Sequence, residues 1–272
     1  MDVQVLILTG FGINCDYETE DAFRRAGAST RRIHLNDLIL DSGILHEAHI
    51  LAIPGGFSFG DDVASGRILA NRVRYKLGPA LQQFVADGKL AIGICNGFQV
   101  MVKMGLLPLF ENEFTQDVTL THNDSNRFEN RWVHLAVEPT TRCVWLQGLE
   151  TLEAPVRHGE GKFVARDSTV LDRMRTQGQI ALRYLRADGT SANGEFPANP
   201  NGSVDDIAGI CDPTGRIFGL MPQPEAYLDA TNHPLWTRNG LIGEGAGIAL
   251  FRNGVNFARE NLLTERLSPA KS

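Results

Sequence analysis

The chain has 272 residues, of which 43% are hydrophobic and 21% are charged, and its formal net charge is −6. This composition is typical of a globular domain with a sizeable core and provides no basic surface for nucleic acid. No stretch approaches the roughly 20 apolar residues of a membrane span. The four cysteines are widely separated and form no Cys-x-x-Cys pair, so we expect neither a metal site nor a disulfide framework.

The first residues give an expectation about the compartment. Residues 1–8 run straight into a strand-like segment and lack the basic region and the cleavage site of a signal peptide. We therefore expect the chain to act in the cytoplasm.

The first hundred residues alternate between predicted strands and helices. Gly27 and Gly88 follow the two helices, as is typical of helix ends. This alternation predicts a parallel sheet with helices on both faces and a ligand site beyond the carboxyl ends of the strands. The expected strands are 3–8, 30–35, 50–53 and 89–94, and the expected helices are 17–26 and 67–87.

The pattern of the sequence changes after residue 117. Residues 189–203 are rich in Gly, Pro and Asn and should form a surface loop. We predict an α/β fold whose mostly parallel sheet is flanked by helices and carries an additional β-rich elaboration. Residues 1–266 should form a single domain, and residues 267–272 a frayed tail. The short strands expected in the second half are 118–121, 132–137, 180–184 and 217–222.

Cys95 lies where a predicted strand turns into a predicted helix. Residues 89–94 suit a buried parallel strand, residues 98–104 have helical spacing, and Gly93 and Gly97 flank the cysteine. These glycines permit the strained backbone and close packing of a nucleophile elbow. The positive end of the helix would favour a thiolate at this position. The alternative is a buried, inert cysteine in an ordinary strand–helix turn.

Two glycine-rich stretches accompany the elbow. Residues 8–15 follow a strand and precede a helix, but Cys15 stands where a dinucleotide-binding turn needs its third glycine. A loop at the rim of the sheet is the better interpretation. Residues 54–62 contain no Lys or Arg to hold a phosphate. Their backbone N–H groups could form half of an oxyanion hole, with the Asn96 N–H as the other half, or the stretch could be a simple tight loop.

Five segments spread along nearly the whole chain resemble a known family. The chain resembles the class I glutamine amidotransferases and, within them, the glutaminase subunits of phosphoribosylformylglycinamidine synthases of purine biosynthesis. The run Pro-Gly-Gly-Phe-Ser-Phe-Gly-Asp-Asp is the most specific part of this likeness. The resemblance implies a flavodoxin-like, mostly parallel sheet flanked by helices. The five segments are residues 8–21, 54–74, 93–99, 155–163 and 219–225.

The resemblance also implies a reaction. Cys95 would attack the side-chain amide of glutamine, release ammonia and leave a glutamyl thioester that water hydrolyses. Matched to the family's motifs, Gly56 and Asn96 would supply the oxyanion N–H groups, and Gln99 would contact bound glutamine. The chain itself would bind no cofactor. Ammonia would pass to a synthetase subunit that uses ATP and Mg to make formylglycinamidine ribonucleotide, and a small bridging subunit is a further candidate partner.

One position departs from the family. The base of the family's catalytic triad is a histidine in Met-Pro-His-Pro-Glu, whereas residues 221–225 read Met-Pro-Gln-Pro-Glu. Glu225 stands where the orienting carboxylate belongs, but the Gln223 amide does not titrate in the working pH range and cannot transfer a proton. We therefore predict a glutaminase weakened by about 10²- to 10⁴-fold, the usual contribution of general acid–base catalysis.

Several alternatives stay open from the sequence. The glutamine at 223 can be an engineered change, a natural feature of a non-catalytic docking and ammonia-channelling subunit, or a change compensated by another histidine such as His233. His158 and Glu160 could lie near the glutamine pocket or a subunit interface, and His158 could equally be a turn residue bonded to backbone. A cysteine peptidase or other hydrolase that shares the elbow is the weakest alternative, because it ignores the match at 54–62.

Overall fold

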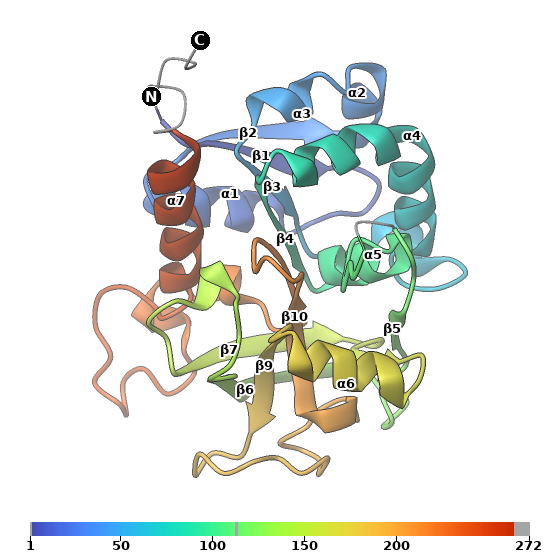
Figure 1. The fold of residues 1–272 in the computed structure, drawn as a ribbon. Coiled ribbons are helices and arrows are strands. Elements are labelled where there is room, and N and C mark those ends of the chain that lie inside the picture. The colour runs from blue at the N-terminus through green and yellow to red at the C-terminus, as the bar shows by residue number, and fades with distance from the viewer. Residues whose placement is uncertain (1, 112–113, 264–272) are drawn as a thin grey trace.

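The chain folds into a central sheet with helices on both faces, in a computed structural model that describes residues 2–111 and 114–263 (Figure 1). The predicted tail at 267–272 and the predicted domain end at residue 266 lie outside the described residues. Within them, no helix is long and apolar enough to cross a membrane.

The main sheet joins a parallel half to an antiparallel half. In the described chain its strand order is β2-β1-β3-β4-β11-β10-β9-β6-β7. The first five strands pair in parallel, and each later pair is antiparallel. The strands are β1 (Gln4–Thr9), β2 (Ser29–His34), β3 (Ile50–Ile53), β4 (Leu90–Ile94), β6 (Glu129–Val137), β7 (Thr151–His158), β9 (Ile180–Leu185), β10 (Ile207–Cys211) and β11 (Ile217–Leu220).

The predicted β-rich elaboration therefore continues the central sheet instead of forming a layer of its own. A small second sheet pairs β5 (Val118–Thr121) with β8 (Lys162–Ala165). Residues 189–203 form the predicted loop, without helix or named strand.

Helices cover the two faces of the parallel half. Figure 1 shows α1 and α7 together on one side of β1, β3 and β4, and α4 and α5 on the other. The helices are α1 (Asp16–Arg25), α2 (Leu35–Leu40), α3 (Ile44–Glu47), α4 (Arg67–Ala86), α5 (Asn96–Met104), α6 (Ser168–Thr176) and α7 (Ile248–Leu262). Short 3₁₀ turns are η1 (Ser58–Asp61), η2 (Val144–Leu146), η3 (Val204–Asp206), η4 (Pro224–Ala226) and η5 (Ala230–Asn232).

The register of three neighbouring strands creates the functional rim. Strand β4 lies between β3 and β11, with Gly93 opposite Ile53 and Ile94 opposite Leu220. Because these strands are parallel, their carboxyl ends meet at one edge. The chain leaves this edge through Pro54, Cys95 and Met221, so three motifs that are distant in sequence converge there.

The predicted elements are confirmed within three residues at either end. Seven further elements were not predicted: β7, β8, β10, α2, α3, α6 and α7. The longest of them is α7. Its start has no side-chain cap on Gly247, and Gly254 interrupts its interior, so the usual helix signals are weak. The helix is held by packing: Phe251 meets Phe23 of α1 edge-on at 5.1 Å. A Cβ on Gly254 would lie 2.2 Å from the Trp145 ring, so this glycine gives the indole its place in the core.

Candidate active site

Cys95 occupies a sharp turn between β4 and α5. Its backbone has φ 51° and ψ −105°, which non-glycine residues rarely adopt. A Cβ on Gly97 would lie 1.8 Å from the Ile53 carbonyl oxygen at the end of β3, and one on Gly93 would lie 2.7 Å from the Gly97 carbonyl oxygen. The predicted elbow is therefore confirmed, and both glycines are required for α5 to pack against the strands.

The glycine-rich loop after β3 is tied to the elbow. The Ser58 N–H donates to the Asn96 side-chain oxygen at 3.1 Å, and the Phe57 N–H donates to the Gly12 carbonyl oxygen at 2.9 Å. Gly56, which precedes both donors, has φ 148°, and its own N–H finds no acceptor within the described chain. An oxyanion donor needs an N–H that the protein has left free in this way.

Asn96 and Gln99 are buried and bonded to each other. The Asn96 amide donates to the Gln99 side-chain oxygen at 2.9 Å, and the Gln99 amide donates to the Glu160 carbonyl oxygen at 2.7 Å. The Glu160 carboxylate accepts the Ser65 N–H at 3.2 Å and lies 3.7 Å from the Lys103 ammonium. These bonds join α5, the turn after β7 and the segment before α4 into one wall beside Cys95.

Three side chains from separate segments meet above Gly55. A Cβ on this glycine would lie 3.2 Å from Gln223 Nε2, 3.4 Å from Cys15 Sγ and 3.6 Å from the Cys95 Cβ. The structure thus brings Gln223 beside the cysteine. It also brings in Cys15, which the sequence reasoning placed only in a rim loop. The position of Cys15 just after β1 could have indicated this, because the carboxyl end of β1 lies beside that of β3.

The environment of the Cys95 thiol favours the protonated form. The residue is 4% exposed, and its Sγ donates to the Arg157 carbonyl oxygen at 3.6 Å. Burial raises the pKa of the thiol well above its usual range, and Glu225 and Cys15 raise that pKa further. The Asn96 N–H at the helix start lowers the pKa by less. The expectation that the helix end holds a thiolate is therefore wrong, because burial outweighs the helix terminus.

Glu225, in the turn η4, is a buried carboxyl group without a partner. It is 3% exposed, and neither of its oxygens has a hydrogen-bond partner in another described residue. Burial raises its pKa to about 8, and Glu18 adds to this rise. A hydrogen bond from its own backbone N–H and the nearby Arg157 guanidinium lower the pKa. The Gln223 side-chain oxygen is likewise buried and without a partner among the described residues. This side of the site is therefore buried and polar, with oxygens that no other described residue hydrogen-bonds.

His158 is held as a neutral imidazole. It is 2% exposed, its Nδ1 lies 3.2 Å from the Asn123 side-chain oxygen, and burial lowers its pKa to about 4. Its ring packs directly on Gly161, where a Cβ would lie 2.2 Å from the ring. His158 is thus bonded to a side chain and also to its own backbone, and it braces the turn that carries Glu160.

His233 is not available as a replacement base. Its Nε2 lies 2.8 Å from the Glu153 carboxylate, and its Nδ1 accepts the Leu235 N–H at 3.2 Å. The ring packs edge-on against Trp132 at 4.7 Å. With both ring nitrogens engaged in this separate cluster, the explanations for Gln223 that remain are an engineered change and a natural one.

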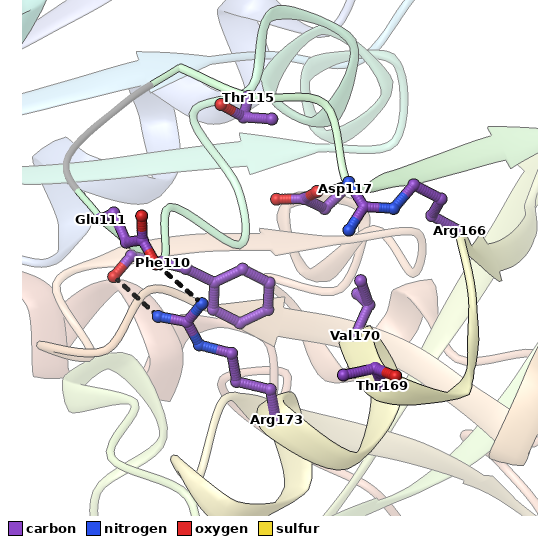
Figure 2. A pocket seen from close by; sticks show the side chains of 8 residues that line it. All are labelled: Phe110, Glu111, Thr115, Asp117, Arg166, Thr169, Val170 and Arg173. Carbon is purple, nitrogen blue, oxygen red and sulfur yellow. Dashed lines mark hydrogen bonds and ion pairs between the residues drawn. The ribbon is translucent and has the colours of Figure 1, made fainter.

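A cavity lies beside α6, and Cys95 is not among its lining residues. It has a volume of about 250 Å³. Figure 2 shows that its charged side chains face one another: the Arg173 guanidinium pairs with Glu111 at 3.1 Å, and Arg166 pairs with Asp117 at 2.5 Å. Its charges are thus largely neutralised internally. The lining residues are Phe110, Glu111, Thr115, Asp117, Arg166, Thr169, Val170 and Arg173.

Within residues 2–111 and 114–263, no group of three or more His, Cys, Asp or Glu side chains could hold a metal ion.

Comparison with known proteins identifies relatives along nearly the whole chain. Residues 2–258 match the model of the CobB/CobQ-like glutamine amidotransferase domain. The chain is 46% identical to the phosphoribosylformylglycinamidine synthase subunit PurQ of Dehalococcoides mccartyi, over 95% of this chain and 98% of that protein. It is 41% identical to the subunit of the same name from Methanococcus maripaludis, over 93% of this chain and 97% of that protein.

Solved structures agree with this assignment. The structure of PurLQS from Thermotoga maritima matches with a TM-score of 0.69 and 27% identity, over 94% of this chain and 99% of that chain. A glutamine amidotransferase from the same organism matches with a TM-score of 0.55 and 14% identity, over 96% of this chain and 100% of that chain, and shares the fold. The predicted class I glutamine amidotransferase fold is confirmed. The chain belongs to the family of CobB/CobQ-like glutamine amidotransferase domains.

Proposed function

We propose that this chain is the glutaminase subunit of a phosphoribosylformylglycinamidine synthase. The observation that carries the proposal is Cys95 on a strained elbow, beside a glycine loop that keeps the Gly56 N–H free. Likeness to two subunits named PurQ over more than nine-tenths of the chain supports the choice of synthase.

The chemistry begins at the Cys95 sulfur. It attacks the side-chain carbonyl carbon of glutamine, and the oxyanion that forms is stabilised by the N–H groups of Gly56 and Asn96. Loss of one such donor typically costs about 3 kcal/mol of transition-state stabilisation. Ammonia leaves, a glutamyl thioester remains on Cys95, and water hydrolyses it to glutamate. Gln99, fixed by Asn96 and Glu160, forms a wall of the glutamine pocket.

The ammonia is consumed by a partner. We propose a synthetase subunit that holds ATP and Mg and makes formylglycinamidine ribonucleotide, together with a small bridging subunit, while this chain binds no cofactor. The likeness to the structure called PurLQS supports a partner subunit. We also propose that the complex acts in the cytoplasm, in keeping with four cysteines that are all free thiols.

A second candidate is a docking subunit that channels ammonia without making it. Gln223 at the place of the family's base, and a Cys95 thiol whose pKa is raised, both favour this candidate.

Synthesis by the assembled complex separates the two candidates. The rate is measured with glutamine and with ammonium salts, for the natural chain and for Cys95→Ala. The glutaminase proposal predicts that Cys95→Ala abolishes glutamine-dependent synthesis and leaves ammonium-dependent synthesis intact. Glutamine-dependent synthesis that is absent from the natural chain, or that survives in Cys95→Ala, would refute it. Retained ammonium-dependent synthesis shows that the variant still folds and docks.

A further inference from the structure

The site as built lacks the proton acceptor that its chemistry needs. The Cys95 thiol is buried and its pKa is raised, so little thiolate exists near neutral pH. The Gln223 amide beside it cannot accept a proton. A glutaminase working through Cys95 therefore requires another group that removes the thiol proton and later protonates the departing ammonia.

Most titratable groups near Cys95 are already occupied. Asp61 accepts from the Asn96 side chain at 3.4 Å and is hydrogen-bonded to the Ser65 side chain. His158 is bonded to Asn123 through Nδ1; its Nε2 has no partner among the described residues, but burial lowers the imidazole pKa to about 4 and makes it a weak base. Cys15, on the opposite side, has a pKa raised to about 12, chiefly by burial. None of these groups combines a free basic atom with a suitable pKa.

Glu225 differs from all of them. It is 3% exposed, and both of its oxygens lack a hydrogen-bond partner in any other described residue. A buried carboxyl group whose hydrogen bonding is limited to its own backbone N–H is costly and calls for a role. Its turn, η4, packs against α1 and β7. The turn begins just after Gln223, and the Nε2 of Gln223 lies beside the Cys95 Cβ above Gly55. The Glu225 charge also acts on the thiol through space.

We propose that Glu225 is the general base and general acid of this chain's glutaminase, and takes over the task that the family gives to the histidine at position 223. This inference rests on the proposed function. It assigns proton transfer to a residue whose expected role is only to orient that histidine.

Glu225 carries one proton in each half of the reaction. The ionised Glu225 carboxylate takes the proton of the Cys95 thiol through one bridging water, as the sulfur attacks the amide carbon of glutamine. Protonated Glu225 then gives this proton to the departing nitrogen, and ammonia leaves from the thioester. In the second half, Glu225 takes a proton from the attacking water and returns it to the Cys95 sulfur as glutamate leaves.

The surroundings tune Glu225 for both steps. A base and acid works best when its pKa lies near the working pH, and burial brings the pKa of Glu225 to about 8. The charged groups that face it are Glu18 of α1, which raises the pKa, and Arg157 of β7, which lowers it. Activity that depends on ionised Glu225 should rise with pH and level off above about 8.

The first test asks whether Glu225→Gln slows or speeds the alkylation of Cys95. The full-length chain is treated with iodoacetamide on the alkaline side of neutrality, and modification of Cys95 is followed by mass spectrometry. If Glu225 is the base, Glu225→Gln slows modification by about 10-fold or more, within the range of general base catalysis. If Glu225 acts only as a charge, its removal lowers the thiol pKa and speeds modification, which overturns the proposal.

Glutamine hydrolysis by the assembled complex gives the second readout. Glu225→Gln should lower kcat by about 100-fold or more with little change in KM, and Glu225→Asp should restore part of it. The matched control is Glu18→Gln, which removes an exposed carboxylate that raises the Glu225 pKa. In this variant the rise of kcat with pH should move to lower pH, and the maximal kcat should stay unchanged. Unchanged kcat in Glu225→Gln refutes the role of Glu225 and leaves the glutaminase function standing. A complex without glutaminase activity but with slowed alkylation refutes the function alone.

Discussion

The two walls of the Cys95 site are built differently. The wall made by the glycine loop and α5 consists mainly of backbone, held by contacts such as Gly97 against the Ile53 carbonyl and the Ser58 N–H on Asn96. The opposite wall at η4 consists of side chains, and Gln223 and Glu225 carry buried oxygens that no other described residue satisfies.

This difference separates what the fold requires from what the chemistry requires. The backbone wall cannot change without moving strands, so it keeps the family's geometry. The side-chain wall contributes little to packing and much to proton transfer, so one substitution there can alter turnover while the fold persists. Polar atoms left unsatisfied in a native protein commonly mark such functional positions.

A substitution at Gly97 should destabilise the backbone wall most. Gly97→Ala places a Cβ 1.8 Å from the Ile53 carbonyl oxygen, so β3 and α5 must separate. We expect a loss of about 4 kcal/mol or more in the free energy of unfolding, measured by denaturant titration. The matched control is Gly78→Ala in α4, where a Cβ would meet nothing within 4 Å. It should be neutral or stabilising by up to about 1 kcal/mol. Equal stability of the two variants would contradict the steric argument.

The side-chain wall can be changed without harm to the fold. Gln223→His restores a titratable ring beside Cys95. We expect glutaminase activity of the assembled complex to rise by up to about 10²-fold, because Glu225 already supplies part of the 10²- to 10⁴-fold that general acid–base catalysis contributes. Gln223→Ala, which removes the amide without adding a base, should give no rise. If activity stays flat in Gln223→His, residue 223 is not the position of the family's base.

The cost of the buried carboxyl group can be measured as stability. Its pKa is 4.5 in the ordinary state and about 8 in the folded chain, so its contribution is fully present below about 4.5 and is lost as pH rises through 8. Glu225→Gln should match the unaltered chain at low pH and exceed its free energy of unfolding by about 4 kcal/mol at pH 8. The control Glu47→Gln, at an exposed carboxylate of α3, should show no such divergence. Parallel stability curves would mean that Glu225 is not dehydrated.

Much of the backbone wall was predictable because its signals are local. Apolar runs at 50–53 and 89–94 and the glycines beside Cys95 predicted the strands and the elbow, and the structure confirms them. Helix α7 was missed because its signals are tertiary: an uncapped start, and a Gly254 whose purpose is to admit Trp145.

By itself, the sequence determined the strand and helix pattern, the strained position of Cys95 and the replacement at Gln223, since periodicity and glycine sterics are properties of neighbouring residues. Only the tertiary structure decided that Cys15 and Gln223 meet above Gly55, that burial outweighs the helix terminus at the thiol, and that Glu225 is buried without a hydrogen bond from another described residue. The reason is physical: dehydration and hydrogen-bond satisfaction depend on which distant segments pack together, and no local pattern records that.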